Sequence, residues 1–152
     1  MKARSIAELE RIWTNVESLK KMSDRVVGVG PLGIGLDGVL TWIPGVGDVY
    51  TVGVGGWLLV QAMRAHAPAG TLARMAGYLG VDTATAAVPF AGAVVDTFFP
   101  GHLMAAKALQ KHIETTHWVE ESWREVRDSG RFAEHQAEMR AQRKKRVVFL
   151  LD

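Results

Sequence analysis

The sequence predicts an all-α domain of two tandem hairpins, each a helix, a Pro/Gly break and a second helix, with flanking amphipathic helices. Two observations lead to this prediction. Apolar residues recur at helical spacing near both ends of the chain, and two glycine-rich apolar blocks between them carry the same Asp–Pro–Gly pattern 45 residues apart. The regions are an N-terminal amphipathic helix (1–25), a two-repeat apolar core (26–106), and a C-terminal amphipathic helix with a basic tail (107–152).

The first predicted helix covers residues 5–24. Ser5 and Glu8 have the spacing of a capping box, which marks a helix start. The apolar stripe that follows consists of Ile6, Leu9, Ile12, Trp13, Val16 and Leu19. A stripe of this kind is typical of a surface helix packed on a core. The alternative is a helix lying in a membrane interface, with Trp13 as its anchor.

The two apolar blocks, residues 26–63 and 75–106, contain no Lys, Arg or Glu. Their only acidic residues are Asp37, Asp48, Asp82 and Asp96. Fourteen of the 16 glycines lie in these blocks, whereas 16 of the 18 Lys and Arg residues lie outside them and the loop between them. Helices of a soluble bundle carry charges on their outer faces. That pattern is missing over much of this chain.

A proline followed by glycine breaks each block into two helices, because proline and glycine together end a helix and favour a turn. We expect helices over 33–43 and 48–64 in the first unit, and over 71–88 and about 90–106 in the second. The turn residues are Pro44, Gly45 and Gly47 in the first unit and Pro89 and Gly92 in the second. Matched spacing of two such units suggests pseudo-twofold packing.

The four aspartates are the candidate site residues. Asp48 follows the Pro–Gly turn and is predicted to cap the next helix. Asp37 and Asp82 occupy equivalent positions, seven residues before each proline, and we expect both to be buried. Carboxylates in apolar surroundings need a partner, water or a proton. Together with Asp96, they either hydrogen-bond backbone groups freed at the breaks or form an ion or proton site.

The C-terminal region predicts an amphipathic helix from 103 to about 128, a break at Gly130, and a polar segment over 132–146 that ends in a basic run. The final residues VVFLLD are too short to span a membrane and long enough to dock or add a strand. The basic run is interpreted as a solvated tail, or as a source of affinity for anionic lipid.

Several function classes are disfavoured by the sequence. Cysteine is absent, which excludes disulfides and thiolate metal sites, and the histidines show no metal-ligand spacing. The turn IPGVGD is similar to that of helix–hairpin–helix DNA-binding units, yet Asp48 would repel phosphate and the next cation is Arg64. No catalytic constellation emerges. We therefore predict no enzyme activity, no cofactor, no metal and no nucleic-acid partner.

The segment GIGLDGVLTWIPGVGDVY, with the second Asp–Pro–Gly pattern and a basic helix after it, resembles the domain of unknown function 4112 family over roughly residues 22–112. The resemblance implies a mainly bacterial protein, often membrane-embedded, without an established activity. Family members usually keep an Asp directly after the second Gly. This chain has Ala93 there, and Asp96 three residues on.

These observations predict a small membrane-associated helical protein, a structural, accessory or scaffold component that contacts membrane lipid. A homo-oligomer or a larger membrane complex would be its further partner. The excess of Lys and Arg outside the blocks places both termini on the cytoplasmic side of the bacterial inner membrane. Membrane-crossing helices and re-entrant hairpins both fit this count. The alternatives are a small ion or proton transporter or channel that uses the aspartates, and a soluble helical oligomer.

Overall fold

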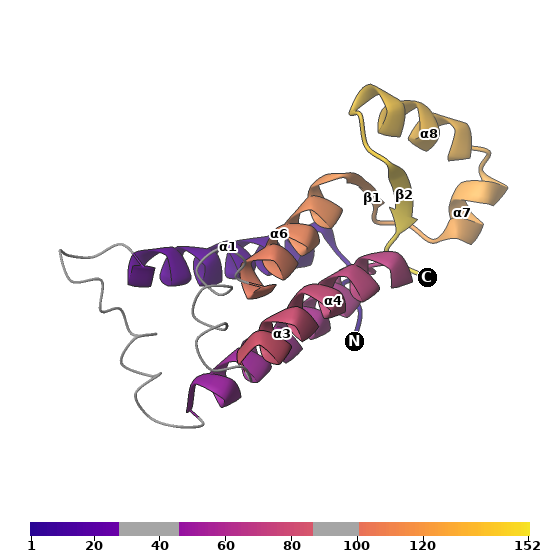
Figure 1. Ribbon diagram of the computed structural model, residues 1–152. Helices are drawn as coiled ribbons and strands as arrows, with labels where there is room; N and C mark the ends of the chain where they lie inside the picture. Colours follow the sequence, from indigo (N-terminus) through magenta and orange to yellow (C-terminus); the bar gives the residue numbers. More distant parts are fainter. Residues whose placement is uncertain (28–45, 87–100) are drawn as a thin grey trace.

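A computed structural model of the chain describes residues 1–27, 46–86 and 101–152, with side chains over 1–21, 52–81 and 101–152. The described part is mostly helical, as predicted, but it also contains a two-stranded sheet that an all-α fold lacks (Figure 1). In chain order the elements are α1 (Ile6–Val27), α3 (Val46–Arg64), α4 (Ala69–Ala86), α6 (Gly101–Glu114), β1 (Thr116–Val119), α7 (Trp123–Asp128), α8 (Phe132–Ala141) and β2 (Arg146–Phe149).

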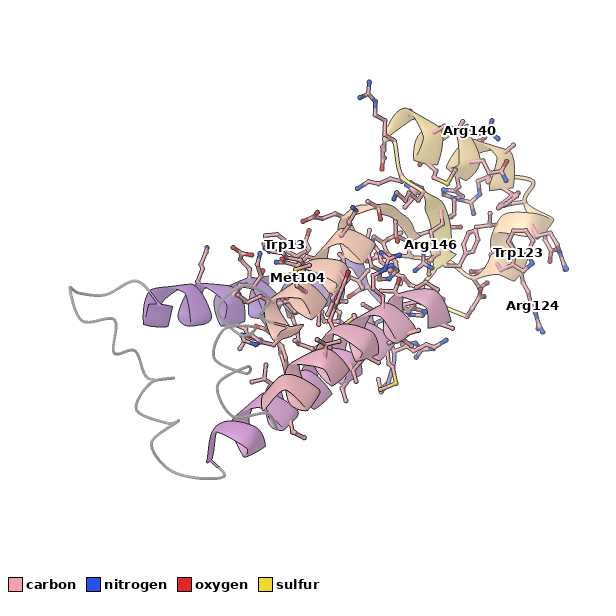
Figure 2. The ribbon with its side chains drawn as sticks, in the orientation of Figure 1. Trp13, Met104, Trp123, Arg124, Arg140 and Arg146 are labelled. Carbon is pink, nitrogen blue, oxygen red and sulfur yellow. The ribbon has the colours of Figure 1, made fainter. Side chains whose placement is uncertain are left out.

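Helix α1 is a surface helix packed on the core, as its periodicity predicts. The Ser5 hydroxyl accepts the backbone N–H of Glu8 at 3.2 Å, which caps the helix start. Leu9, Ile12 and Val16 are buried in the core. The indole N–H of Trp13 donates to the Glu114 carboxylate of α6 at 2.9 Å, and its side chain lies where α1 faces α6 (Figure 2). In this structure the Trp13 side chain therefore contacts α6. An interfacial role for Trp13 stays a prediction.

Helix α6 is the central helix of the described fold, since α1, α3 and α4 all pack against it. Its inner positions hold Ala105, Ala106, Leu109 and Ile113, all buried. Small alanines let neighbouring helices approach closely, while Leu109 and Ile113 supply apolar volume. The core formed here also includes Leu58, Ala62 and Met75 from α3 and α4.

Helices α3 and α4 form a hairpin joined by residues 65–68 and run side by side in Figure 1. Their bounds lie within two residues of the predicted 48–64 and 71–88. Among the described residues, no helix combines the length and the apolar character needed to cross a bilayer. The expectation of membrane-spanning helices thus finds no support in this part of the chain.

The predicted helix over 103–128 is interrupted between α6 and α7, so the prediction is wrong for residues 115–122 and holds for Trp123–Asp128. Helix α6 ends at Glu114, and the residues THWV form β1 instead, because β-branched and aromatic side chains favour extended backbone. Strand β2 pairs with β1 in parallel, with Thr116 opposite Arg146 and Val119 opposite Phe149. The final apolar segment therefore adds a strand, one of its two expected outcomes.

Helices α7 and α8 connect the two parallel strands, and Gly130 marks the predicted break between them with a φ of +74°. Side chains alternate across a strand, so the sheet has two different faces. Thr116 and Trp118 contact the end of α6, whereas His117 contacts α8. The sheet consequently lies between the helical core and α8. We define residues 116–152, which include the sheet, as the C-terminal module.

Candidate functional site

The predicted site residues are described only in part. Asp37, Pro44, Gly45, Pro89, Gly92 and Asp96 lie outside the described residues. Gly47 and Asp48 fall in the first turn of α3, which begins at Val46, so Asp48 lies inside the helix rather than at the predicted cap. Asp82 lies in α4, and the side chains of Asp48 and Asp82 are outside the described set. An ion or proton site at these aspartates stays a prediction.

The outer face of the α3–α4 hairpin is the most unusual surface of the described fold. On α3, the exposed residues from position 52 to 63 are Val52, Gly53, Gly56, Val60 and Met63. On α4, those from position 75 to 81 are Ala76, Gly77, Gly80 and Val81. These positions recur at helical spacing and include no charged or polar side chain. We call them together the apolar face.

Exposure on the apolar face is substantial. Val52 is 60 % exposed, Met63 51 % and Val60 47 %, although each is a side chain that burial in an apolar environment would stabilise. Only the loop end of the hairpin carries cations, Arg64 and Arg74, both exposed. The hairpin therefore has an apolar side, with positive charge at the end nearest the C-terminal module (Figure 1). Exposed apolar residues that gather into a large patch commonly mark sites of contact with a partner or a membrane.

Glycines on the hairpin differ in what they contact. A Cβ at Gly55 would lie 3.1 Å from Cδ2 of Leu79, so this glycine allows α3 and α4 to pack closely. A Cβ at Gly53, Gly56, Gly77 or Gly80 would meet no atom within 4 Å among the described residues. Close helix contact inside this hairpin thus depends on Gly55, and the other four glycines lie on the apolar face.

A buried polar junction lies at the loop end of the hairpin. Nε2 of the His112 ring lies 2.9 Å from the backbone oxygen of Ala65, and Nη2 of Arg146 lies 2.9 Å from Nδ1 and 3.0 Å from Nε2 of the same ring. A neutral ring that donates through Nε2 to Ala65 accepts from Arg146 at Nδ1. Burial lowers the pKa of His112 to about 4, against the raising effect of the hydrogen bond to Ala65, and the positive charge of Arg146 lowers it further. Both ring nitrogens are therefore used by a neutral imidazole.

Arg146 joins β2 to the helices at this junction. Its Nη2 also donates to the backbone oxygen of His66 at 3.2 Å, and its Nε donates to the Thr116 hydroxyl at 3.3 Å. Burial lowers the pKa of its guanidinium. Figure 2 shows Arg146 directed toward the helices, whereas Arg124 projects away from the molecule. Although the basic run was interpreted as a solvated tail, its last residue is a structural contact.

A second group of polar side chains lies on the opposite face of the sheet. His117 of β1, with His135 and Glu138 of α8, offers three candidate metal-ligand atoms within 4.8 Å of one another. Spacings between the histidines alone do not indicate this group, because its third member is a glutamate. One signal was present: His135 and Glu138 are three residues apart, which places them on one helix face. His117, on a strand that was predicted to be helix, had no such signal.

Comparison with known proteins identifies one family. The family model described as Domain of unknown function (DUF4112) matches residues 12–113, two thirds of the chain. No curated protein and no solved structure matches the chain. The match runs from within α1 to the last turn of α6, so it includes the apolar face. The strands, α7, α8 and the His117–His135–Glu138 group lie outside it.

Proposed function

The chain belongs to the DUF4112 family, and we propose that its family region is a membrane-associated structural or accessory module whose apolar face rests against lipid. The observation that carries the proposal is the apolar face itself, exposed on two adjacent helices and free of charge. A helix that is apolar on its outer as well as its inner side needs a second apolar environment. For α3, the inner side is the contact with α6 and the outer side would be the bilayer.

Helices α3 and α4 have 19 and 18 residues, a length that can cross a bilayer, so their apolar character decides between crossing and partial insertion. Since no described helix is long and apolar enough to cross a bilayer, the re-entrant or interfacial arrangement is the one we propose. Arg64 and Arg74 at the loop end would then lie at the headgroups, where cations interact favourably with anionic lipid. The charged C-terminal module would remain in water.

The location and the tandem arrangement form part of the same proposal. We place the protein at the bacterial inner membrane with both termini cytoplasmic, supported by the 16 cations outside the apolar blocks and their loop. The two Asp–Pro–Gly units would pair around a pseudo-twofold axis, supported by their matched spacing. A scaffold role with no enzyme activity is consistent with a surface that offers apolar contact rather than reactive groups.

The experiment compares vesicle binding of full-length variants. Replacing Val52 and Val60 together by Gln removes apolar surface without adding charge, and Gln has a good helix propensity. The matched control replaces Ala7 and Asn15, exposed positions of α1, by Gln. Burial of one Val is worth about 1.5–3 kcal/mol, so the Val double variant should bind vesicles about tenfold more weakly or worse. The control should bind like wild type.

Two outcomes would contradict the proposal. One is equal flotation of all three proteins with vesicles that contain phosphatidylglycerol. The other is a wild-type protein that stays soluble as an oligomer without detergent or lipid and becomes monomeric in the Val double variant. The second outcome would assign the apolar face to another copy of the chain. Sedimentation velocity of the protein without detergent or lipid shows whether the apolar face is covered by a second copy of the chain.

A further inference from the structure

The His117–His135–Glu138 group combines two imidazoles and one carboxylate from two elements that are distant in sequence. His117 is 8 % exposed, and its Nε2 has no hydrogen-bond partner in the described part of the chain. Buried polar atoms almost always have a partner, so an unpartnered one calls for an unseen ion or water. We propose that His117, His135 and Glu138 bind a divalent transition-metal ion of the Zn²⁺ class.

The partner on the other side of the His117 ring makes Nε2 available as a ligand. Nδ1 of His117 lies 3.4 Å from Oε1 of Gln142, and the tautomer with its proton on Nδ1 donates to this oxygen. The lone pair is then on Nε2, which lies 3.4 Å from the Glu138 carboxylate. Two groups that both present lone pairs repel one another unless a cation or a proton lies between them. Metal-bound histidines commonly donate their second N–H to an oxygen, as His117 does to Gln142.

His135 shows a similar arrangement. Its Nδ1 lies 3.8 Å from Oε2 of Glu138, and its Nε2 lies 3.9 Å from Oε1 of Glu121. Neither ring nitrogen has a hydrogen-bond partner among the described residues, and both atoms are buried. Glu121 is held by Arg131, whose two terminal nitrogens donate to its two carboxylate oxygens. With a metal on Nδ1, Glu121 would accept the remaining N–H and orient the ring.

The ligand set selects the class of metal. Imidazole and carboxylate ligands together suit Zn²⁺ and its neighbours, whereas Mg²⁺ and Ca²⁺ prefer oxygen ligands alone. Zn²⁺ bonds of about 2.0–2.1 Å place tetrahedral ligand atoms about 3.4 Å apart. The three atoms here lie within 4.8 Å, so a small inward movement completes the site. Glu138 can make that movement because its side chain is 58 % exposed.

The metal would attach α8 to the sheet. Helix α8 has no fully buried residue, and its described ring contacts are those of Phe132 with Trp123 and of His135 with Phe149. Its contacts with β1 and β2 include the three ligands and Gln142. Small structural modules that lack a core often depend on a metal ion for stability. A metal that joins β1 to α8 would supply this attachment.

The test uses the full chain without a histidine tag, stripped with a chelator and titrated with Zn²⁺ by calorimetry and with Co²⁺ by visible absorption. We expect one ion per chain and the intense visible bands of four-coordinate Co²⁺. Glu138→Gln and His135→Gln should each weaken Zn²⁺ binding about 100-fold or more, and Gln142→Leu about 10- to 100-fold through loss of the His117 partner. The matched control is Glu134→Gln, an exposed carboxylate on the same helix.

Some results would overturn the metal site. These are no Zn²⁺ binding by the wild type, unchanged binding in Glu138→Gln or His135→Gln, or equal weakening in Glu134→Gln. If His117→Gln fails to fold, Glu138→Gln still tests the metal site, because Glu138 is exposed and its replacement leaves the buried side chains in place. Hydrogen exchange gives a second measurement: Zn²⁺ should slow exchange in α8 of the wild type and not in Glu138→Gln. Unchanged exchange on Zn²⁺ addition would contradict the attachment role.

Discussion

Helices α1 and α3 pack against the same central helix, α6, and present opposite kinds of outer face. The inner faces are alike: Leu9, Ile12 and Val16 of α1 and Leu58 and Ala62 of α3 are all buried. The exposed positions of α1 hold mainly Glu, Arg, Lys and small polar residues, as on an ordinary soluble helix, whereas those of α3 between 52 and 63 hold only Val, Gly and Met. One core thus has two different exteriors.

Because of this difference, the stability of the fold and the surroundings that the protein contacts depend on different faces of the helices. The inner faces determine whether the helices fold together, because apolar area removed from water stabilises both in the same way. The outer faces contribute little to the fold of one chain, but they determine what the chain contacts. Substitutions on inner and outer faces should therefore affect different measurements.

The largest expected effect is on the inner faces. Leu58→Ala in α3 and Leu9→Ala in α1 should each lower the free energy of unfolding by about 2–5 kcal/mol, because both side chains are fully or almost fully buried. Val60→Ala on the apolar face should change it by less than about 1 kcal/mol. Chemical denaturation in detergent measures all three. A cost for Val60→Ala as large as that for Leu58→Ala would show that the outer face is buried within the protein.

A smaller effect is expected at the junction where the ends of α1 and α3 meet, since His66 contacts the Ala3 carbonyl and His112 the Ala65 carbonyl. His112 has a pKa of about 4 when folded and 6.5 ordinarily, so between these values the unfolded chain binds the extra proton. The contribution of neutral His112 to the free energy of unfolding is complete above pH 6.5. It decreases by about 2–3 kcal/mol as pH falls toward 4.

His112→Gln tests this dependence, because Gln cannot be protonated in that range. The difference in unfolding free energy between wild type and variant should shrink as pH falls from 7 to 4, while Arg146 stays charged throughout. A difference that is constant with pH would mean that His112 has the same pKa in the folded and the unfolded protein.

The smallest expected effect distinguishes two glycines of α3. Gly53→Ala should raise the unfolding free energy by about 0.5–1 kcal/mol, because Ala restricts the unfolded chain and its Cβ has open space. Gly55→Ala should raise the free energy of unfolding by less, or lower it, since the new Cβ would lie 3.1 Å from Leu79. Thermal unfolding of both variants measures the difference. Equal stabilisation would mean that α3 and α4 pack less closely than described.

Helices with strong local signals were predictable from the sequence. The apolar stripe of α1 and the apolar segment of α3 between Asp48 and Arg64 each predicted a helix within a few residues of its described bounds. Strand β1 was not predictable in the same way. The residues THWV favour extended backbone, but the helical apolar spacing of α6 continues to Val119, and the strand that pairs with β1 lies about 30 residues later in the chain.

The candidate metal site could be predicted even less. His135 and Glu138 share a helix face and can be found by spacing, but His117 joins them only through the sheet. The predicted aspartates depended on local pattern alone, and their side chains lie outside the described residues. A site built across a parallel pair of strands depends on tertiary structure, which local periodicity does not contain.

The two faces of the sheet also restrict which changes in chain length the protein can tolerate. His112 and His117 are five residues apart, one hydrogen-bonded on the helical side and the other directed toward α8. One residue inserted between them would exchange the faces of Thr116 and His117, since strand side chains alternate. The exposed turn at Gly130 can lengthen without this consequence. Insertions and deletions among relatives that share the sheet should therefore concentrate between α7 and α8 and avoid residues 112–119.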